Sequence, residues 1–151
     1  MPAVGDTCRS WLGGPNRRNR FGPRGCAVSG QPDALASGTD VINIKPSRVG
    51  GYLTSKEIHD VALANGVPVF CGGTLETAVG RAANLALATL PGFTLPGDIS
   101  ATSRYYARDI GQTFELDGDG CLVAPFGPGT GVELDLDVVE ELTQERWTAS
   151  V

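Results

Sequence analysis

Residues 41–51 read VINIKPSRVGG, and this stretch carries the most information about the architecture of the chain. Its first five residues, Val41–Lys45, are mostly β-branched and predict a strand that ends at the lysine. Successive side chains of a strand point to opposite faces, so Asn43 and Lys45 share one face and the two isoleucines share the other. The sequence therefore predicts a strand that brings an amide and an amine to one end of a sheet.

A helix and a second strand are predicted after the glycine pair that closes this stretch. Thr54–Glu57 has the spacing of a capping box, which indicates a helix that ends near Asn65, before Gly66. Val67–Cys71 is a short apolar run, typical of a buried strand. The helix residues expected to face inward are Ile58, Val61 and Ala62.

The same alternation continues along the chain. Thr74 is predicted to cap a helix that runs to about Leu90, and Phe93–Leu95 is predicted as a third short strand. Short apolar strands that alternate with helices indicate βαβ units and a parallel sheet. The expected fold class is therefore α/β.

The C-terminal part is predicted to contain a hairpin and a short helix. Thr113–Leu116 and Leu122–Ala124 flank the turn-like sequence Asp117–Gly120, so we expect an antiparallel hairpin. Asp137 and Glu140 are placed to open a terminal helix with apolar residues on one face.

The N-terminal segment differs from the rest of the chain in composition. Residues 1–33 carry five arginines, six glycines and four prolines with only two aspartates, a net charge of +3. Residues 34–151 carry 7 basic and 15 acidic residues, a net charge of −8. We therefore expect an unstructured segment at 1–33 and a folded part at 34–151. The alternative is a basic arm for an anionic partner, with contacts from Arg17, Arg18, Arg20 and Arg24.

Composition also excludes several classes of function. The acidic balance argues against a nucleic-acid or anionic-membrane partner, because both require a basic face. We see no signal peptide and no apolar run of the ~20 residues that cross a membrane, so a cytoplasmic protein is expected. The four cysteines form no C-x-x-C pair and there is one histidine, so no zinc site is predicted. The cysteines are expected to be reduced thiols.

Several further motifs occur in a characteristic order and carry a family resemblance. After VINIKPSRVGG come CGGTLET at 71–77, GRAAN at 80–84, LPGDIS at 95–100, RYY at 104–106 and GPGTGV at 127–132. Together they resemble the o-succinylbenzoate synthase and N-acylamino acid racemase group of the enolase superfamily. The resemblance covers residues 34–151 and implies a partial (β/α) barrel, strands 6–8, with the hairpin C-terminal to them.

The resemblance also implies a chemistry. Members of the group hold Mg²⁺ with three carboxylates and place two lysines on either side of a small carboxylate substrate. Removal of a proton beside the carboxylate forms an enediolate. The synthase, a lyase of menaquinone biosynthesis, then eliminates water, and the racemase, an isomerase, returns the proton to the other face. We favour the synthase as the commoner of the two.

One catalytic position of the family is matched by a residue of this chain. Lys45 corresponds to the lysine at the end of the sixth strand, where it would act as base or acid or stabilise an enediolate. Without the resemblance it reads as a strand-end lysine that reaches solvent. The resemblance further implies substrate-binding roles for Asn43, Gly72, Gly73, Thr74 and Asp98.

Simpler roles remain open for these positions. Gly72–Thr74 can be an ordinary strand-to-helix turn, and Asp98 can be a turn or cap residue. Glu76 is expected to be a first-turn helix carboxylate rather than a metal ligand.

The other catalytic positions of the family have no counterpart here. No metal ligand is assigned, and residues 1–33 contain no lysine to match the second-strand lysine. A complete barrel needs about 200–250 residues, whereas 118 follow Asp33. We expect a fragment that is inactive alone. The alternatives are a split enzyme completed by an N-terminal half on another chain, and a non-catalytic binding fragment.

Overall fold

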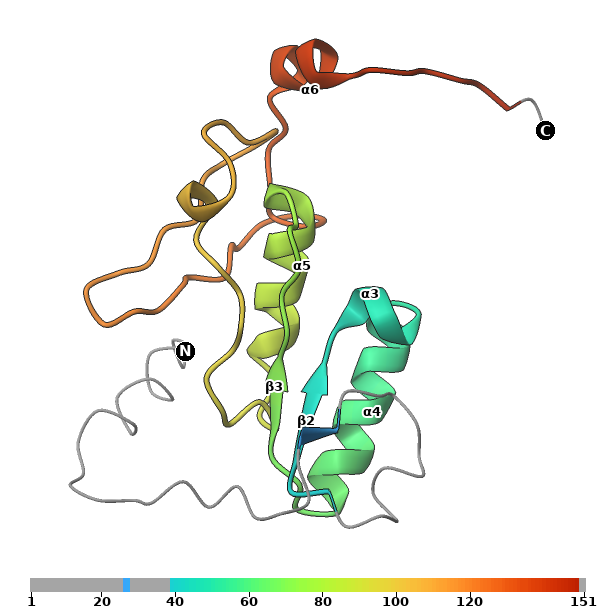
Figure 1. Ribbon diagram of the computed structural model, residues 1–151, viewed down its shortest axis with the longest axis vertical. Coiled ribbons are helices and arrows are strands. Elements are labelled where there is room, and N and C mark those ends of the chain that lie inside the picture. Colours follow the sequence, from blue (N-terminus) through green and yellow to red (C-terminus); the bar gives the residue numbers. More distant parts are fainter. Residues whose placement is uncertain (1–25, 28–38, 150–151) are drawn as a thin grey trace.

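The computed structural model describes residues 26–27 and 39–149 (Figure 1). The elements in chain order are β1 (Cys26–Ala27), β2 (Val41–Ile44), α3 (Pro46–Val49), α4 (Tyr52–Ala64), β3 (Val69–Cys71), α5 (Ala78–Ala88), a 3₁₀ turn η1 (Thr102–Arg104) and α6 (Leu136–Leu142). The order of strands and helices confirms the α/β class predicted from the alternating pattern.

A parallel sheet lies at the centre of the described part of the chain. Its strands are ordered β1-β2-β3, and Asn43 of β2 stands beside Phe70 of β3 in the register. The isoleucines of β2 point to the helical side, where they form a core with Val69, Cys71, Ala62, Leu87 and Phe93. Helices α4 and α5 therefore cover the same face of the sheet (Figure 1).

The other side of α5 supports the C-terminal loops. A second core joins α5 to the segments around Phe114 and Leu122, and its members are Ala78, Ala82, Leu85, Phe114, Leu122 and Ala124. Because small residues line much of this helix face, the loops approach the helix closely. Helix α5 is thus packed between the sheet and the C-terminal region (Figure 1).

Helix α4 differs from its prediction at its start. It begins at Tyr52 rather than at the Thr54–Glu57 capping box, and the hydroxyl of Ser55 donates to the carbonyl of Gly51, 2.7 Å away. The inward face carries Ser55, His59 and Ala62, whereas Val61 is 48% exposed, which makes its expected inward position wrong. The predicted end is confirmed: α4 stops at Ala64, and Gly66 takes a left-handed φ of 67°.

The third predicted strand does not form a ladder. The segment after Phe93 runs beside β3, with Leu95 N–H 3.4 Å from Val69 O and Asp98 N–H 2.8 Å from Cys71 O. Only an isolated parallel bridge between Gly72 and Asp98 results. Pro96 lies between these two donors and has no N–H, which accounts for the interruption.

The predicted hairpin at 113–124 is also wrong, although its turn exists. The Asp117 carboxylate accepts from the N–H groups of Asp119 and Cys121 and closes the turn. The backbone of Phe114, however, exchanges hydrogen bonds with Thr102 of η1 at 2.7 and 2.9 Å instead of pairing across the turn. Both hydrogen bonds are to Thr102, 12 residues upstream of Phe114, and they take the place of the hairpin ladder.

The structure describes residues 26–27 of the predicted N-terminal segment. Cys26–Ala27 forms a two-residue strand paired with β2, inside the segment expected to be unstructured. A strand this short leaves no periodic signal in a sequence. The arginines of the alternative basic arm lie outside the described residues, and the boundary at residue 34 stays a prediction.

Candidate functional site

Lys45 stands at the point where β2 gives way to α3. Pro46 occupies the first position of α3, where its fixed φ suits a helix start and its missing N–H costs nothing. The strand therefore ends at Ile44, one residue before the predicted end at Lys45, and the Lys45 side chain is half-buried. Its ammonium Nζ donates to the carbonyl oxygen of Gly73 at 2.8 Å, so the amine is held in the fold instead of extending into solvent.

The Lys45 side chain packs directly against the backbone of Gly72. A Cβ at this position would lie 2.3 Å from Asn43 Oδ1 and 2.6 Å from Cγ and Cε of Lys45. Real Cβ atoms do not approach other atoms so closely, so only glycine lets both side chains lie over the neighbouring strand. The backbone N–H of Gly72 donates to Ile44 O at 3.0 Å and continues the strand pairing.

Asn43 brings an unpaired acceptor to the same face. Its Oδ1 is buried and has no hydrogen-bond donor among the described residues. Buried polar atoms are usually paired, and an orphaned acceptor beside a lysine is a feature that a ligand donor can satisfy. Asn43, Lys45 and Gly72 thus form one cluster at the carboxyl ends of β2 and β3.

Gly73 and Asp98 meet through their backbones. Gly73 N–H donates to Asp98 O at 2.7 Å, and a Cβ on Gly73 would lie 2.3 Å from that oxygen. The Asp98 side chain itself is exposed. The structure therefore brings Asp98 to the loop predicted to line a pocket, with its main chain holding the loop.

Thr74 belongs to the same loop, and it is not the predicted helix cap. Helix α5 begins four residues later at Ala78, with Thr77 in the N-cap position. The N–H of Thr74 instead donates to both Glu76 carboxylate oxygens at 2.8 Å, and its hydroxyl donates to Oε1 at 2.6 Å.

Glu76 is correspondingly not a first-turn helix residue. Burial opposes its charge, but hydrogen bonds from Thr74 and Asn84 outweigh burial and hold the pKa of Glu76 below its ordinary value. Asn84 is in turn bound by the hydroxyl of Tyr52 at 2.9 Å. Sequence reasoning missed this network; the shared block GRAAN, which contains Asn84, was the available signal.

Cys71 ends β3 directly beneath the cluster. Burial raises the pKa of its thiol to about 12, and the nearby Glu76 carboxylate adds to this while the Lys45 ammonium opposes it. Cys71 is free and buried, as expected of a reduced thiol. Cys121 is disulfide-bonded, which corrects the expectation for that residue, because spacing along a chain does not reveal which sulfurs meet in space.

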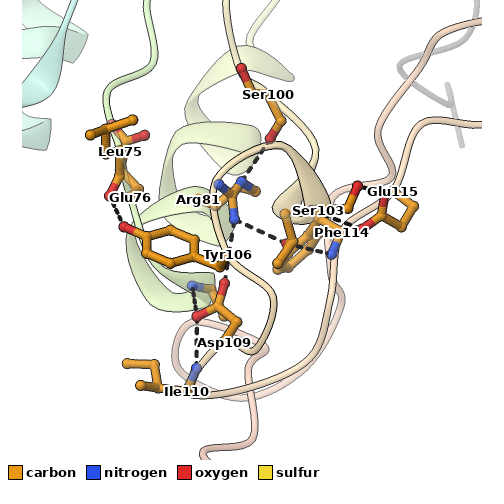
Figure 2. A network of polar contacts seen from close by, with 12 residues as sticks. Leu75, Glu76, Arg81, Ser100, Ser103, Tyr106, Asp109, Ile110, Phe114 and Glu115 are labelled. Atoms are coloured by element: carbon orange, nitrogen blue, oxygen red, sulfur yellow. Dashed lines mark hydrogen bonds and ion pairs between the residues drawn. The ribbon is translucent and has the colours of Figure 1, made fainter. Parts of the chain in front are cut away.

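A buried polar network fixes the start of α5 behind the loop (Figure 2). The Asp109 carboxylate accepts from the N–H of Ala78 at 3.0 Å, so it caps the helix from 31 residues away. The Arg81 guanidinium donates to Ser100 O at 2.8 Å and to Thr102 Oγ1 at 3.0 Å. This network ties the C-terminal loops to the helix that follows the Gly72–Thr74 loop.

The described residues do not supply a metal centre. Within residues 26–27 and 39–149, no group of three or more His, Cys, Asp or Glu side chains is arranged to hold a metal ion. The Mg²⁺ implied by the resemblance therefore does not fit the donor set present in this part of the chain. No helix in these same residues has the length and hydrophobicity to span a membrane.

Comparison with known proteins places these features in a family. The profile described as "Enolase C-terminal domain-like" matches residues 25–138. An N-succinylamino acid racemase from an Amycolatopsis species is 52% identical over 120 residues, which is 78% of this chain and 32% of the relative. An o-succinylbenzoate synthase from Geobacillus stearothermophilus is 50% identical over 105 residues, 69% of this chain and 28% of the relative.

A solved structure is similar to the chain in both fold and sequence. A member of the enolase superfamily from Listeria innocua superposes with a TM-score of 0.70 at 43% identity, over 75% of this chain and 31% of that protein. The chain thus spans about a third of the length of the curated relatives it matches.

Proposed function

Because the chain belongs to the enolase superfamily, whose C-terminal domain its residues 25–138 match, we propose that it supplies one catalytic lysine and part of the substrate pocket of an enediolate-forming enzyme. The observation that carries the proposal is the cluster at the ends of β2 and β3. There the Lys45 ammonium is held 2.8 Å from Gly73 O, beside the unpaired Oδ1 of Asn43.

Lys45 is proposed to handle the proton at the carbon beside a substrate carboxylate. As a neutral amine it takes that proton, the C–H electron pair moves into the carboxylate to form the enediolate, and the amine becomes an ammonium. As an ammonium it stabilises the enediolate charge or returns a proton. Its hydrogen bond to Gly73 O supports this role, because the Nζ atom is oriented before any substrate arrives.

The neighbouring residues are proposed to bind the small carboxylate substrate. Asn43 would direct its free acceptor toward a donor on the substrate. Gly72 and Gly73 would let the substrate approach the backbone closely, and Thr74 and Asp98 would border the same opening. The alternative of an ordinary turn is weakened by Gly72, because a turn alone does not require space for two polar side chains.

The metal and the second lysine must come from elsewhere for this chemistry. In the family Mg²⁺ stabilises the enediolate charge, but the described residues offer no set of ligands for it. We therefore propose that the ligands are supplied by a part of the protein other than the described one or by a complementing chain. A non-catalytic binding role remains the alternative if no such partner exists.

The reaction that follows enediolate formation distinguishes two candidate functions. In an o-succinylbenzoate synthase the intermediate expels a hydroxyl group as water; in a racemase it is reprotonated on the opposite face. We propose the synthase reaction first. The racemase is the second candidate, favoured by the 52% identity to an N-succinylamino acid racemase, against 50% to a synthase.

Complementation tests the proposal. The chain is co-expressed with the part of the Amycolatopsis relative that precedes the matched region, and both substrate types are assayed with added Mg²⁺. We expect turnover only from the combined chains, loss of turnover in Lys45→Met, and retention in the matched control Lys56→Met on exposed α4. Turnover that survives Lys45→Met would refute the catalytic role of Lys45. Turnover by the single chain would refute the need for a complementing part.

A further inference from the structure

One peptide group of the candidate site lies between two opposite charges. The carbonyl of Gly73 accepts from the Lys45 ammonium at 2.8 Å. The N–H of Thr74, which belongs to the same peptide group, donates to both oxygens of the Glu76 carboxylate at 2.8 Å. No peptide bond in the described residues is cis, so this C=O and this N–H point in opposite directions. The cation, the peptide dipole and the anion are therefore in series.

This order of charges makes each hydrogen bond strengthen the other. A carboxylate at the N–H end polarises the peptide and makes its carbonyl oxygen a better acceptor. Both hydrogen bonds are also charge-assisted, a class about twice as strong as neutral ones. The negative charge of Glu76 thus strengthens the hydrogen bond of the Lys45 ammonium through the peptide group. The two side chains themselves form no hydrogen bond or ion pair with each other in the described residues.

The peptide has little freedom to turn away. The Gly73 N–H is bound to Asp98 O at 2.7 Å, and the position is so close-packed that even a methyl group would collide there. Rotation of the Gly73–Thr74 peptide would break the hydrogen bonds at both of its ends. The loop therefore holds the Lys45 ammonium in one direction.

Glu76 is itself anchored to the helices. Its Oε1 accepts from Asn84 of α5 at 2.9 Å, and Asn84 is fully buried and bound by the Tyr52 hydroxyl of α4. The titratable groups around the carboxylate are Cys71 and Tyr52, whose pKa values are raised by burial first, with a smaller contribution from the Glu76 charge. Near neutral pH the raised pKa values keep both groups neutral while Glu76 is charged, so Glu76 is the source of negative charge among these three groups.

We propose that Glu76 is a positioning residue for Lys45, acting through the Gly73–Thr74 peptide. The inference rests on the proposed role of Lys45 in the reaction, but the geometry that carries it can be tested without turnover. The role of Glu76 follows from one observation, that Lys45 and Glu76 bind the two ends of the same peptide group.

The chain offers an internal reference for the test, because Lys45 and Lys56 are its only lysines. Each is acetylated with a limiting amount of reagent across a range of pH, and the two sites are quantified by mass spectrometry in the folded chain. In Glu76→Gln, which keeps the shape of the side chain, we expect Lys45 to be acetylated several-fold faster relative to Lys56, because the hydrogen bond that holds its amine is weakened. The rate at Lys56 itself should not change.

Two controls separate a charge effect from a packing effect. Glu57→Gln makes the same change of charge on the exposed face of α4 and should leave the ratio of the Lys45 rate to the Lys56 rate unchanged. Thr74→Val removes the hydroxyl contact to Glu76 but keeps the backbone N–H, so it should also leave this ratio unchanged. A ratio that is unchanged in Glu76→Gln, or that rises equally in Glu57→Gln, overturns the proposal.

A measurement on the unmodified chain covers the case in which Glu76→Gln does not fold. Acid titration followed by NMR should move the Thr74 amide proton as Glu76 is protonated, below the ordinary glutamate pKa. The Lys45 side-chain nitrogen should move with the same midpoint. A Thr74 transition without a Lys45 transition overturns the proposal.

These results are independent of the proposed function. A raised ratio in a chain that never supports turnover would keep the positioning contact and remove the enzyme assignment. An unchanged ratio in a complemented, active enzyme would keep the enzyme assignment and remove the positioning role of Glu76.

Discussion

The Arg81 guanidinium and the Asp109 carboxylate lie 3.5 Å apart in the interior, with side chains 1% and 0% exposed (Figure 2). Charges so deeply buried are tolerated only when their remaining donors and acceptors are satisfied. Here Arg81 also donates to Ser100 and Thr102, while Asp109 accepts from Ala78 and Ile110. The pair holds the C-terminal loops against α5, the helix that follows the Gly72–Thr74 loop.

Removal of one partner of this pair should be strongly destabilising. Asp109→Ala leaves the Arg81 charge buried and the Ala78 N–H uncapped, so we expect a loss of about 3–5 kcal/mol in the free energy of unfolding. Urea denaturation measures it. The matched control is Glu141→Ala in the exposed pair with Arg108, which should cost less than about 1 kcal/mol. Equal losses in the two variants would contradict the buried role.

Gly72→Ala should displace the Lys45 side chain. The new methyl group would collide with Asn43 Oδ1 and with the Lys45 stem, so the hydrogen bond to Gly73 O should break. We expect several-fold faster acetylation of Lys45 relative to Lys56, measured by mass spectrometry. Gly118→Ala, at a turn where nothing lies within 4 Å of the added carbon, is the control and should leave the ratio unchanged.

His59→Ala should weaken the contact between α4 and the segment after α5. The His59 ring stacks on Phe93 with centroids 5.2 Å apart, and its Nε2 accepts from Gly92 N–H at 3.0 Å. Truncation leaves this buried N–H unpaired, a cost of about 1–3 kcal/mol before the lost packing is added. Thermal unfolding checks the prediction. His59→Gln, which can retain an acceptor, should recover part of the loss.

Alkaline pH should destabilise the chain through Cys71. Burial raises the pKa of this thiol from 9.0 to about 12, so the folded state favours the neutral form. The contribution to stability is fully present below pH 9, the unfolded value, and is lost as the pH rises through about 12. Denaturation at pH 8 to 11 should show a steeper loss in the parent chain than in Cys71→Ala. Parallel pH profiles would contradict this.

The parts of the fold that depend on neighbouring residues could be predicted from sequence. Alternating apolar patterns placed β2, β3 and the two longer helices, and Gly66 marked the end of α4. The predictions failed where distant partners decide the outcome. Phe114 pairs with Thr102 instead of across the Asp117 turn, and the start of α5 is capped by Asp109, 31 residues after Ala78.

The candidate site likewise combines features set by local sequence with contacts set by the tertiary structure. Sequence by itself determined that Lys45 stands at a strand end with Asn43 on the same face, because strand alternation and Pro46 are local properties of the chain. Only the tertiary structure decided what receives the Lys45 ammonium: the carbonyl of Gly73, 28 residues away. The physical reason is that hydrogen-bond partners are chosen by distance and direction in space, which local pattern does not encode.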